Sequence, residues 1–142
     1  MKGPLEHARM LVRKAENDLH AAKTVLPTLV ALDTVCFHCQ QAVEKCLKAM
    51  LALRDVEFPH THDLRILCDL AAPLVPGVAE FRSRIHALLR YAVEVRYEDE
   101  DDPKVDHAQK ALAVAEDIRQ FTVDLLASPA RMPAREDTTD DQ

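Results

Sequence analysis

The chain has 142 residues, 48% of them apolar, which is enough to build one domain around one hydrophobic core. Only two glycines are present, Gly3 and Gly77, and this excludes glycine-rich phosphate loops and dinucleotide-binding fingerprints. The net charge of -6 excludes a broad positive field that would attract nucleic acid, so any such contact requires a local basic patch.

The first half of the sequence predicts two long helices. Apolar residues between positions 5 and 26 recur every three or four places, which indicates an amphipathic helix that ends near Pro27. A second stripe of the same period covers residues 36–53, and we expect Asp33 to cap the start of this helix. Pro59 disfavours helix in the segment before it, so a loop should follow.

The second half predicts one short and two long helices. The short helix should cover residues 63–72, the next residues 78–95 and the last residues 105–125. Five consecutive acids at positions 98–102 repel one another and indicate an exposed loop. Residues 128–142 contain two prolines and four acids but few apolar side chains, so we expect a disordered tail.

Together these elements predict an all-α fold, an antiparallel up-and-down bundle of four long helices and one short helix. The bundle should occupy residues 1–127, and no segment has the apolar–polar alternation of a strand. No apolar run is long enough to span a membrane, and the N-terminus lacks the apolar core of a signal peptide. We therefore expect a cytoplasmic protein with reduced cysteines.

Cys36 and Cys39 have a spacing that occurs in zinc sites, but it also places both on the apolar stripe of their helix. Buried cysteine commonly behaves as a small hydrophobic residue, and no second ligand pair follows. We interpret the two cysteines as core residues and expect neither a metal nor a cofactor. A metal-bound bundle that uses these two thiols stays as an alternative.

The segment His60–Asp63 stands just before the predicted short helix. Thr61 or Asp63 can accept hydrogen bonds from the free N–H groups at the helix start. The two histidines also allow a ligand-binding or proton-transfer site, because imidazole gains and loses protons near neutral pH. Capping and loop anchoring is the simpler interpretation of this segment.

Two groups of polar residues are candidates for binding. Gln41, Lys45 and Lys48 form one polar stripe on the second helix, which spacing alone would assign to a solvated face. The fourth helix carries a concentration of arginine, and arginine binds phosphate through two parallel hydrogen bonds. The residues of this cluster, at and just beyond the predicted helix, are Arg82, Arg84, His86, Arg90, Tyr91, Arg96 and Tyr97.

Four segments resemble the HEPN family (higher eukaryotes and prokaryotes nucleotide-binding). Residues 37–51 are similar to the signature second helix of small prokaryotic members, which reads roughly FHxQQAxEKxLKAxL. Residues 61–64 resemble the THDL element that follows it, and residues 96–97 resemble the RY element that ends the fourth helix. Residues 15–22 resemble the family's opening helix, so the resemblance covers roughly residues 5–126.

The resemblance implies a helical bundle, usually a homodimer, often paired with a minimal nucleotidyltransferase in a toxin–antitoxin-like system. Some members are metal-independent ribonucleases, which use an R-x(4-6)-H motif in the helix corresponding to residues 78–95. The two matches in this chain, Arg13 with His20 and Arg54 with His60, lie outside that helix. Within it, the only histidine precedes Arg90, in the reverse order.

Three hypotheses follow. The first is a HEPN-like binding module, the partner of a nucleotidyltransferase, that contacts a nucleotide or RNA. The residues that would bind its ligand or its partner are Gln41, Lys45, Lys48, His62, Arg82, Arg90, Arg96 and Tyr97. The second is an endoribonuclease with a non-standard site at His86 and Arg90. The third is a structural helical adaptor.

We also expect a homodimer, on the reasoning that the apolar stripes of the second and fourth helices exceed what one bundle buries.

Overall fold

The computed structural model describes residues 3–95 and 103–128, and of residues 90–95 it describes only the backbone. The described residues form no strand, which confirms the predicted all-α class. They form four long α-helices and one short one: α1 (Pro4–Val25), α2 (Leu32–Leu53), α3 (Leu64–Ala71), α4 (Arg82–Val95) and α5 (Val105–Ala127).

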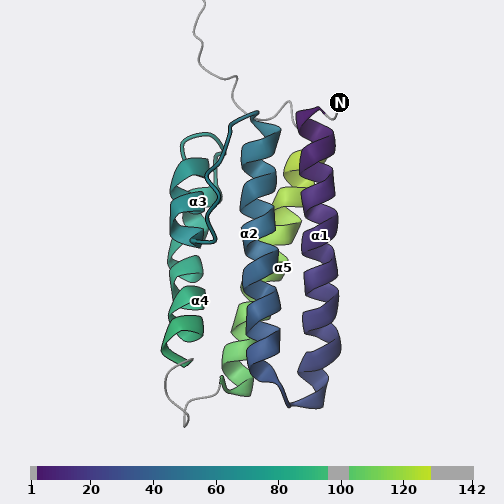
Figure 1. Ribbon diagram of the computed structural model, residues 1–142, viewed down its shortest axis with the longest axis vertical. Coiled ribbons are helices and arrows are strands. Elements are labelled where there is room, and N and C mark those ends of the chain that lie inside the picture. The colour runs from purple at the N-terminus through teal and green to yellow at the C-terminus, as the bar shows by residue number, and fades with distance from the viewer. Residues whose placement is uncertain (1–2, 96–102, 129–142) are drawn as a thin grey trace, which may run out of the picture.

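The helices form an up-and-down bundle with α2 in its middle (Figure 1). Helix α1 lies antiparallel to α2 on one side, α3 and α4 lie on the other, and α5 passes behind (Figure 1). Helix α2 contacts each of the other four α-helices. One side of α2 remains at the surface, flanked by α1 and α3, and this arrangement positions the candidate site.

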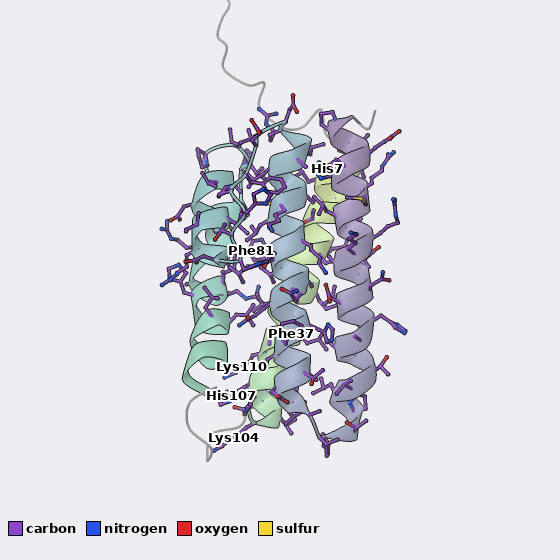
Figure 2. All side chains as sticks on the ribbon, viewed as in Figure 1. His7, Phe37, Phe81, Lys104, His107 and Lys110 are labelled. Carbon is purple, nitrogen blue, oxygen red and sulfur yellow. The ribbon has the colours of Figure 1, made fainter. Side chains whose placement is uncertain are left out.

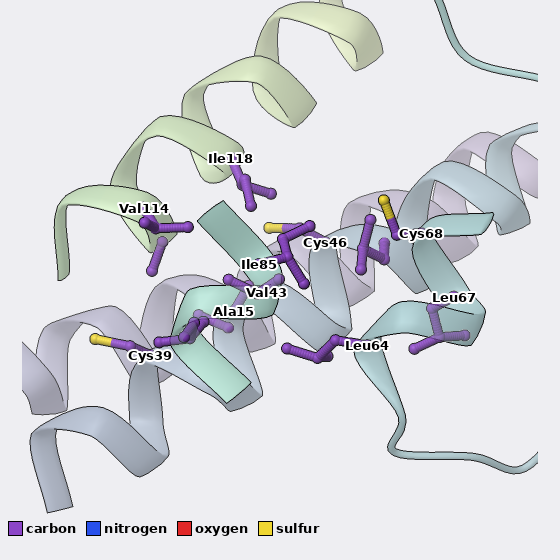
Figure 3. Packing of buried hydrophobic residues seen from close by; sticks show 14 of the residues in the cluster. Ala15, Cys39, Val43, Cys46, Leu64, Leu67, Cys68, Ile85, Val114 and Ile118 are labelled. Atoms are coloured by element: carbon purple, nitrogen blue, oxygen red, sulfur yellow. The ribbon is translucent and has the colours of Figure 1, made fainter. Parts of the chain in front are cut away.

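The core is built around the apolar stripe of α2. Val43, Cys46 and Met50 are fully buried and belong to one cluster with residues of every other α-helix. Figure 3 shows Val43 and Cys46 in this cluster with Ile85 of α4 and Ile118 of α5. Burying a side chain of this size contributes about 1.5–3 kcal/mol. The α2 stripe is thus satisfied within one chain, so it gives no reason to expect a dimer.

The connection between α1 and α2 differs from the prediction. Helix α1 ends at Val25, close to the predicted end, and a short 3-10 helix Leu26–Thr28 contains the expected proline. The chain then turns through Leu29 and Ala31, whose φ angles are 62° and 53°. Ala31 is the N-cap of α2, so the prediction of Asp33 as the cap is wrong. Asp33 lies in the first turn, where a carboxylate favours the positive helix end.

The fourth predicted helix is divided in two. Val78–Phe81 is a 3-10 helix, and the α-helix begins only at Arg82. Gly77 precedes it with φ 94°, and a Cβ there would lie 3.1 Å from the ring of Phe121. A glycine is therefore required by both the backbone conformation and the close approach of α5.

Two predicted segments, the acidic loop at 98–102 and the tail beyond Ser128, lie outside the described residues. Within the described part of the chain, no helix combines the length and the apolar character that crossing a bilayer requires.

Candidate ligand-binding face of the second helix

The surface side of α2 carries a group of polar residues, which we call the α2 polar face. Residues three or four positions apart in a helix lie on the same side of it, so one side of α2 can collect several polar residues along its length. The α2 polar face consists of His38, Gln41, Glu44, Lys45 and Lys48, together with His62 from the loop before α3. Three of the predicted ligand residues on α2 and the predicted His62 are thus brought onto one surface.

One cluster on this face is centred on Glu44, whose side chain is only 8% exposed. Lys48 Nζ donates to Glu44 Oε2 at 3.0 Å, and His62 Nδ1 donates to the same oxygen at 3.0 Å. A buried carboxylate is costly unless it is paired and hydrogen-bonded, so these two donors account for its presence.

The loop that carries His62 is held at several points. Asp63 accepts a hydrogen bond from the backbone N–H of Arg65 at 3.0 Å and is the N-cap of α3, which confirms the capping prediction. Thr61 Oγ1 accepts from the N–H of Asp63 at 3.1 Å. The Lys48 ammonium lies 5.8 Å from the centre of the Phe58 ring. The imidazole of His62 is nevertheless 85% exposed.

A second cluster joins α2 to α1 and is centred on Asp18, whose side chain is 11% exposed. His38 Nδ1 donates to Asp18 Oδ1 at 2.9 Å, and Lys45 Nζ donates to Asp18 Oδ2. Sequence reasoning did not select Asp18 or His38. Asp18 adjoins Leu19 on the buried side of α1. An acidic residue among buried positions is a signal in the sequence that could have predicted a positively charged partner on a neighbouring helix.

The two clusters share one composition: a carboxylate, a lysine and a histidine. An ionised carboxylate can only accept hydrogen bonds, so Nδ1 of His38 and of His62 carries the hydrogen that is donated. Nε2 of each ring takes no part in the hydrogen bond to the carboxylate. Each lysine charge is balanced by the carboxylate that it contacts. The imidazoles, oriented by Asp18 and Glu44, are therefore the groups that this face can present to a ligand.

Gln41 lies between the two clusters along α2. It is half-buried, and within the described part of the chain it has no hydrogen-bond partner. Its amide offers both donors and acceptors.

Arg82 and Arg84 of α4 do not join the α2 polar face. Arg82 pairs with Asp69 of α3 at 2.6 Å, and Arg84 pairs with Asp117 of α5 at 2.8 Å. His86 is exposed and has no partner among the described residues. The side chain of Arg90, and all of Arg96 and Tyr97, lie outside the described residues.

A groove of about 310 Å³ runs between α4 and α5. Its mostly apolar lining comprises Arg84, Ala87, Leu88, Lys110, Ala111, Ala113 and Val114. Figure 2 labels Lys110, which belongs to α5, and Phe37, which belongs to α2. Gln41, Lys45, Lys48 and His62 thus lie on the α2 polar face, whereas Arg82 and Arg84 pair with acids of α3 and α5.

The four cysteines are free and buried, as expected for core residues. Burial raises the pKa of Cys36 to about 11 and the pKa of Cys39 to about 12. Such thiols are poor metal ligands, because the thiolate is the ligating form. In the described ranges, 3–95 and 103–128, no group of three or more ligand-type residues could hold a metal ion.

Known proteins are similar to this chain in sequence and in fold. One relative, "Putative toxin MJ1304" of Methanocaldococcus jannaschii, is 41% identical over 54 residues, which are 38% of this chain and 35% of the relative. The match thus spans about a third of that relative's length. The crystal structure of ST0689, an archaeal HEPN homologue, superposes with a TM-score of 0.67 at 20% identity, over 89% of this chain and 99% of that one.

At 20% sequence identity, the similarity to ST0689 shows a shared fold alone. The sequence itself matches the HEPN domain family over residues 8–126, from the first turns of α1 to the end of α5. The chain therefore belongs to the HEPN domain family.

Proposed function

We propose that this HEPN domain is a toxin-like binding module, and that its α2 polar face holds the phosphate groups of a nucleotide or RNA. The observation that carries the proposal is the pair of buried carboxylates, Glu44 and Asp18, each of which orients an imidazole. The toxin designation of the M. jannaschii relative supports the toxin-like part.

Electrostatics decide how such a face can bind an anion. Lys45 and Lys48 are already paired, so they alone provide no net positive charge. A phosphate oxygen that accepts a hydrogen bond from His62 Nε2–H forms a charge-assisted bond when the ring is protonated. Glu44 offsets the charge of the Lys48 ammonium, so the protonated ring is the source of net positive charge in this cluster, and the acidic remainder of the chain weakens the attraction at long range.

We also propose a nucleotidyltransferase-type protein partner and a homodimer. Both need exposed apolar surface, which the described residues contain at Leu29, Val30, Phe37, Ile66 and Leu70. Ile66 and Leu70 lie one turn apart on the outer side of α3. Light scattering at tens of micromolar tests the dimer, and co-purification with a co-expressed nucleotidyltransferase tests the partner.

An endoribonuclease centred on His86 and Arg90 is less well supported by the geometry. General acid–base catalysis needs an imidazole held in place, and His86 has no orienting partner among the described residues. His62 and His38 do have one. RNA cleavage that His86→Ala abolishes would favour the catalytic alternative.

Fluorescence anisotropy with a labelled RNA oligomer tests the binding proposal. His62→Gln keeps a donor for Glu44 but removes the imidazole, and we expect it to weaken binding about 3–10-fold, the range for one charge-assisted hydrogen bond. Arg82→Ala on α4 is the matched control and should change little. Absence of RNA and nucleotide binding, or loss only in Arg82→Ala, contradicts the proposal.

A further inference from the structure

We infer that a groove between α1 and the C-terminal end of α5 is the docking site of the chain's own acidic segment, residues 136–141. The groove shares no residue with the α2 polar face, so this contact is independent of the proposed function. Three features carry the inference: two arginines without partners at the groove, the charge of the segment, and the short distance over which the chain connects them.

The groove has a volume of about 350 Å³ and is lined by residues of α1 and α5. Its apolar lining includes Val12 and Leu126, which are only 6% and 7% exposed and which pack in one cluster with Val123. The C-terminal end of α5 lies beside the N-terminal half of α1 (Figure 1), and Ala127, the last residue of α5, also lines the groove. The chain therefore leaves α5 at the groove itself.

The α1 side of the groove carries an excess of positive charge. Arg9 and Arg13 are exposed, lie about one turn apart, and have no partner within the described part of the chain. Glu16, the acidic residue of the lining, already faces Arg119 of α5 at 3.8 Å. A guanidinium stays charged and can bind a carboxylate through two parallel hydrogen bonds, so Arg9 and Arg13 suit a segment rich in carboxylates.

The sequence that follows α5 contains such a segment. Residues 136–142 carry no basic residue and four acids, which are Glu136, Asp137, Asp140 and Asp141. The two arginines of the same tail, Arg131 and Arg135, precede these acids, so residues 136–142 have a net charge of -4. The charge of the segment is thus opposite to that of the groove.

The connection is long enough to bring the acids back to α1. Ser128 ends α5, and eight residues, 128–135, separate Ala127 from Glu136. At about 3.3 Å per residue they allow Glu136 to lie up to about 30 Å from Ala127. The α1 lining, from Arg9 to Glu16, spans only about 10 Å along the helix axis. A tether of this length keeps the acids at an effective concentration on the order of millimolar, so exposed ion pairs, each weak, can hold the segment.

A second copy of the chain fits this groove less well. The central part of a stable protein interface is apolar, and no exposed large apolar side chain of the described residues lines the groove. The acidic segment of another molecule would also lose translational and rotational freedom on binding, a cost that the tethered segment avoids. Docking between two copies is therefore an outcome of the test and is not the arrangement inferred here.

Paramagnetic relaxation, measured by NMR on the full chain, tests the docking. Thr138→Cys places a reactive thiol between the two pairs of acids, and a nitroxide attached there broadens the signals of nearby residues. The four native cysteines are buried, so the new thiol is the one that a reagent labels. We expect the broadening to concentrate in residues 9–16 and 123–127. It should fall at least about twofold in about 1 M salt, where the screening length is about 3 Å.

Substitutions on both sides of the contact assign it. Arg13→Gln should reduce the local broadening, and Arg9→Gln combined with Arg13→Gln should abolish it. Lys110→Gln is the matched control for Arg13→Gln, because it also removes one exposed positive charge without a partner among the described residues. It should leave the broadening unchanged. Circular dichroism checks that each variant is folded.

Three results would overturn the inference. The first is broadening spread evenly over the chain or centred on Arg84 and Lys110. The second is local broadening that persists when both Arg9 and Arg13 are replaced. The third comes from a mixture of nitroxide-bearing chain with isotope-labelled chain that lacks the nitroxide: broadening there as strong as within one molecule would show that a second copy supplies the segment.

Discussion

Glu44 and His62 form a hydrogen bond between a carboxylate that is 8% exposed and an imidazole that is 85% exposed. The carboxylate also receives the ammonium of Lys48, which is itself only 16% exposed. Such an arrangement fixes the direction of an imidazole at the surface. Burying the carboxylate removes water from its charge, and the hydrogen bonds from Lys48 and His62 offset this free-energy cost.

Replacing Glu44 should therefore lower the free energy of unfolding more than replacing His62. We expect Glu44→Ala to lower the free energy of unfolding by about 1–3 kcal/mol, because Lys48 loses its partner in a poorly solvated position. His62→Ala, at an exposed site, should cost no more than about 0.5–1 kcal/mol. Urea denaturation followed by circular dichroism measures both, and equal losses would show that Glu44 is not a buried anchor.

The α3 cap gives a pH-dependent prediction. The hydrogen bond from the Arg65 side chain lowers the pKa of Asp63 below its ordinary value of 3.8, so the folded state binds this proton less readily than the unfolded state. The stabilisation is thus present above pH 3.8 and is lost as the pH falls toward the lowered pKa. Asp63→Ala should cost about 1 kcal/mol at pH 7. A cost that stays constant down to pH 2 would contradict this.

The cysteines should be unreactive in the folded protein. Burial raises the pKa of Cys39 and of Cys46 to about 12, above the ordinary 9.0, so the folded state holds these protons more tightly. Their contribution to stability is full below pH 9.0 and declines as the pH rises toward 12. A thiol reagent at pH 8 should label the four cysteines only in denaturant. Rapid labelling of native protein would show that the α2 core stripe is open.

The turn before α2 should accept glycine. Ala31 has a φ of 53°, which costs an L-residue roughly 1–2 kcal/mol relative to glycine. Ala31→Gly should therefore raise the midpoint of thermal unfolding, although greater freedom of the unfolded chain offsets part of the gain. Asp33→Ala, at the position that the sequence suggested as the cap, should change stability by less than the loss of a true N-cap. A large loss in Asp33→Ala would restore it as the cap.

The helices were predictable because each buries a stripe with the helical period, and Cys36 and Cys39 fell on such a stripe. The motif resemblance, over roughly residues 5–126, also identified the family, which the family match over residues 8–126 confirms. By contrast, Ala31 as an N-cap has no sequence signal, since alanine neither accepts side-chain hydrogen bonds nor favours positive φ.

The candidate site was only half predictable. Lys45 and Lys48 were visible as a polar stripe, but their partners depend on packing between helices. Asp18 reaches Lys45 only because α1 packs against α2, and His62 reaches Glu44 only because the loop returns toward α2. Arg82 was selected for its charge, and its bond to Asp69 of α3 is a tertiary contact that no spacing in the sequence reveals.

The most direct measurement is an NMR titration of the isotope-labelled chain with a single-stranded hexanucleotide. Perturbed signals should concentrate in residues 37–48 and 58–63, with the imidazoles of His38 and His62 among the most affected. Perturbation centred instead on Arg82, Arg84 and Lys110 would place the ligand between α4 and α5 and contradict the assignment of the α2 polar face.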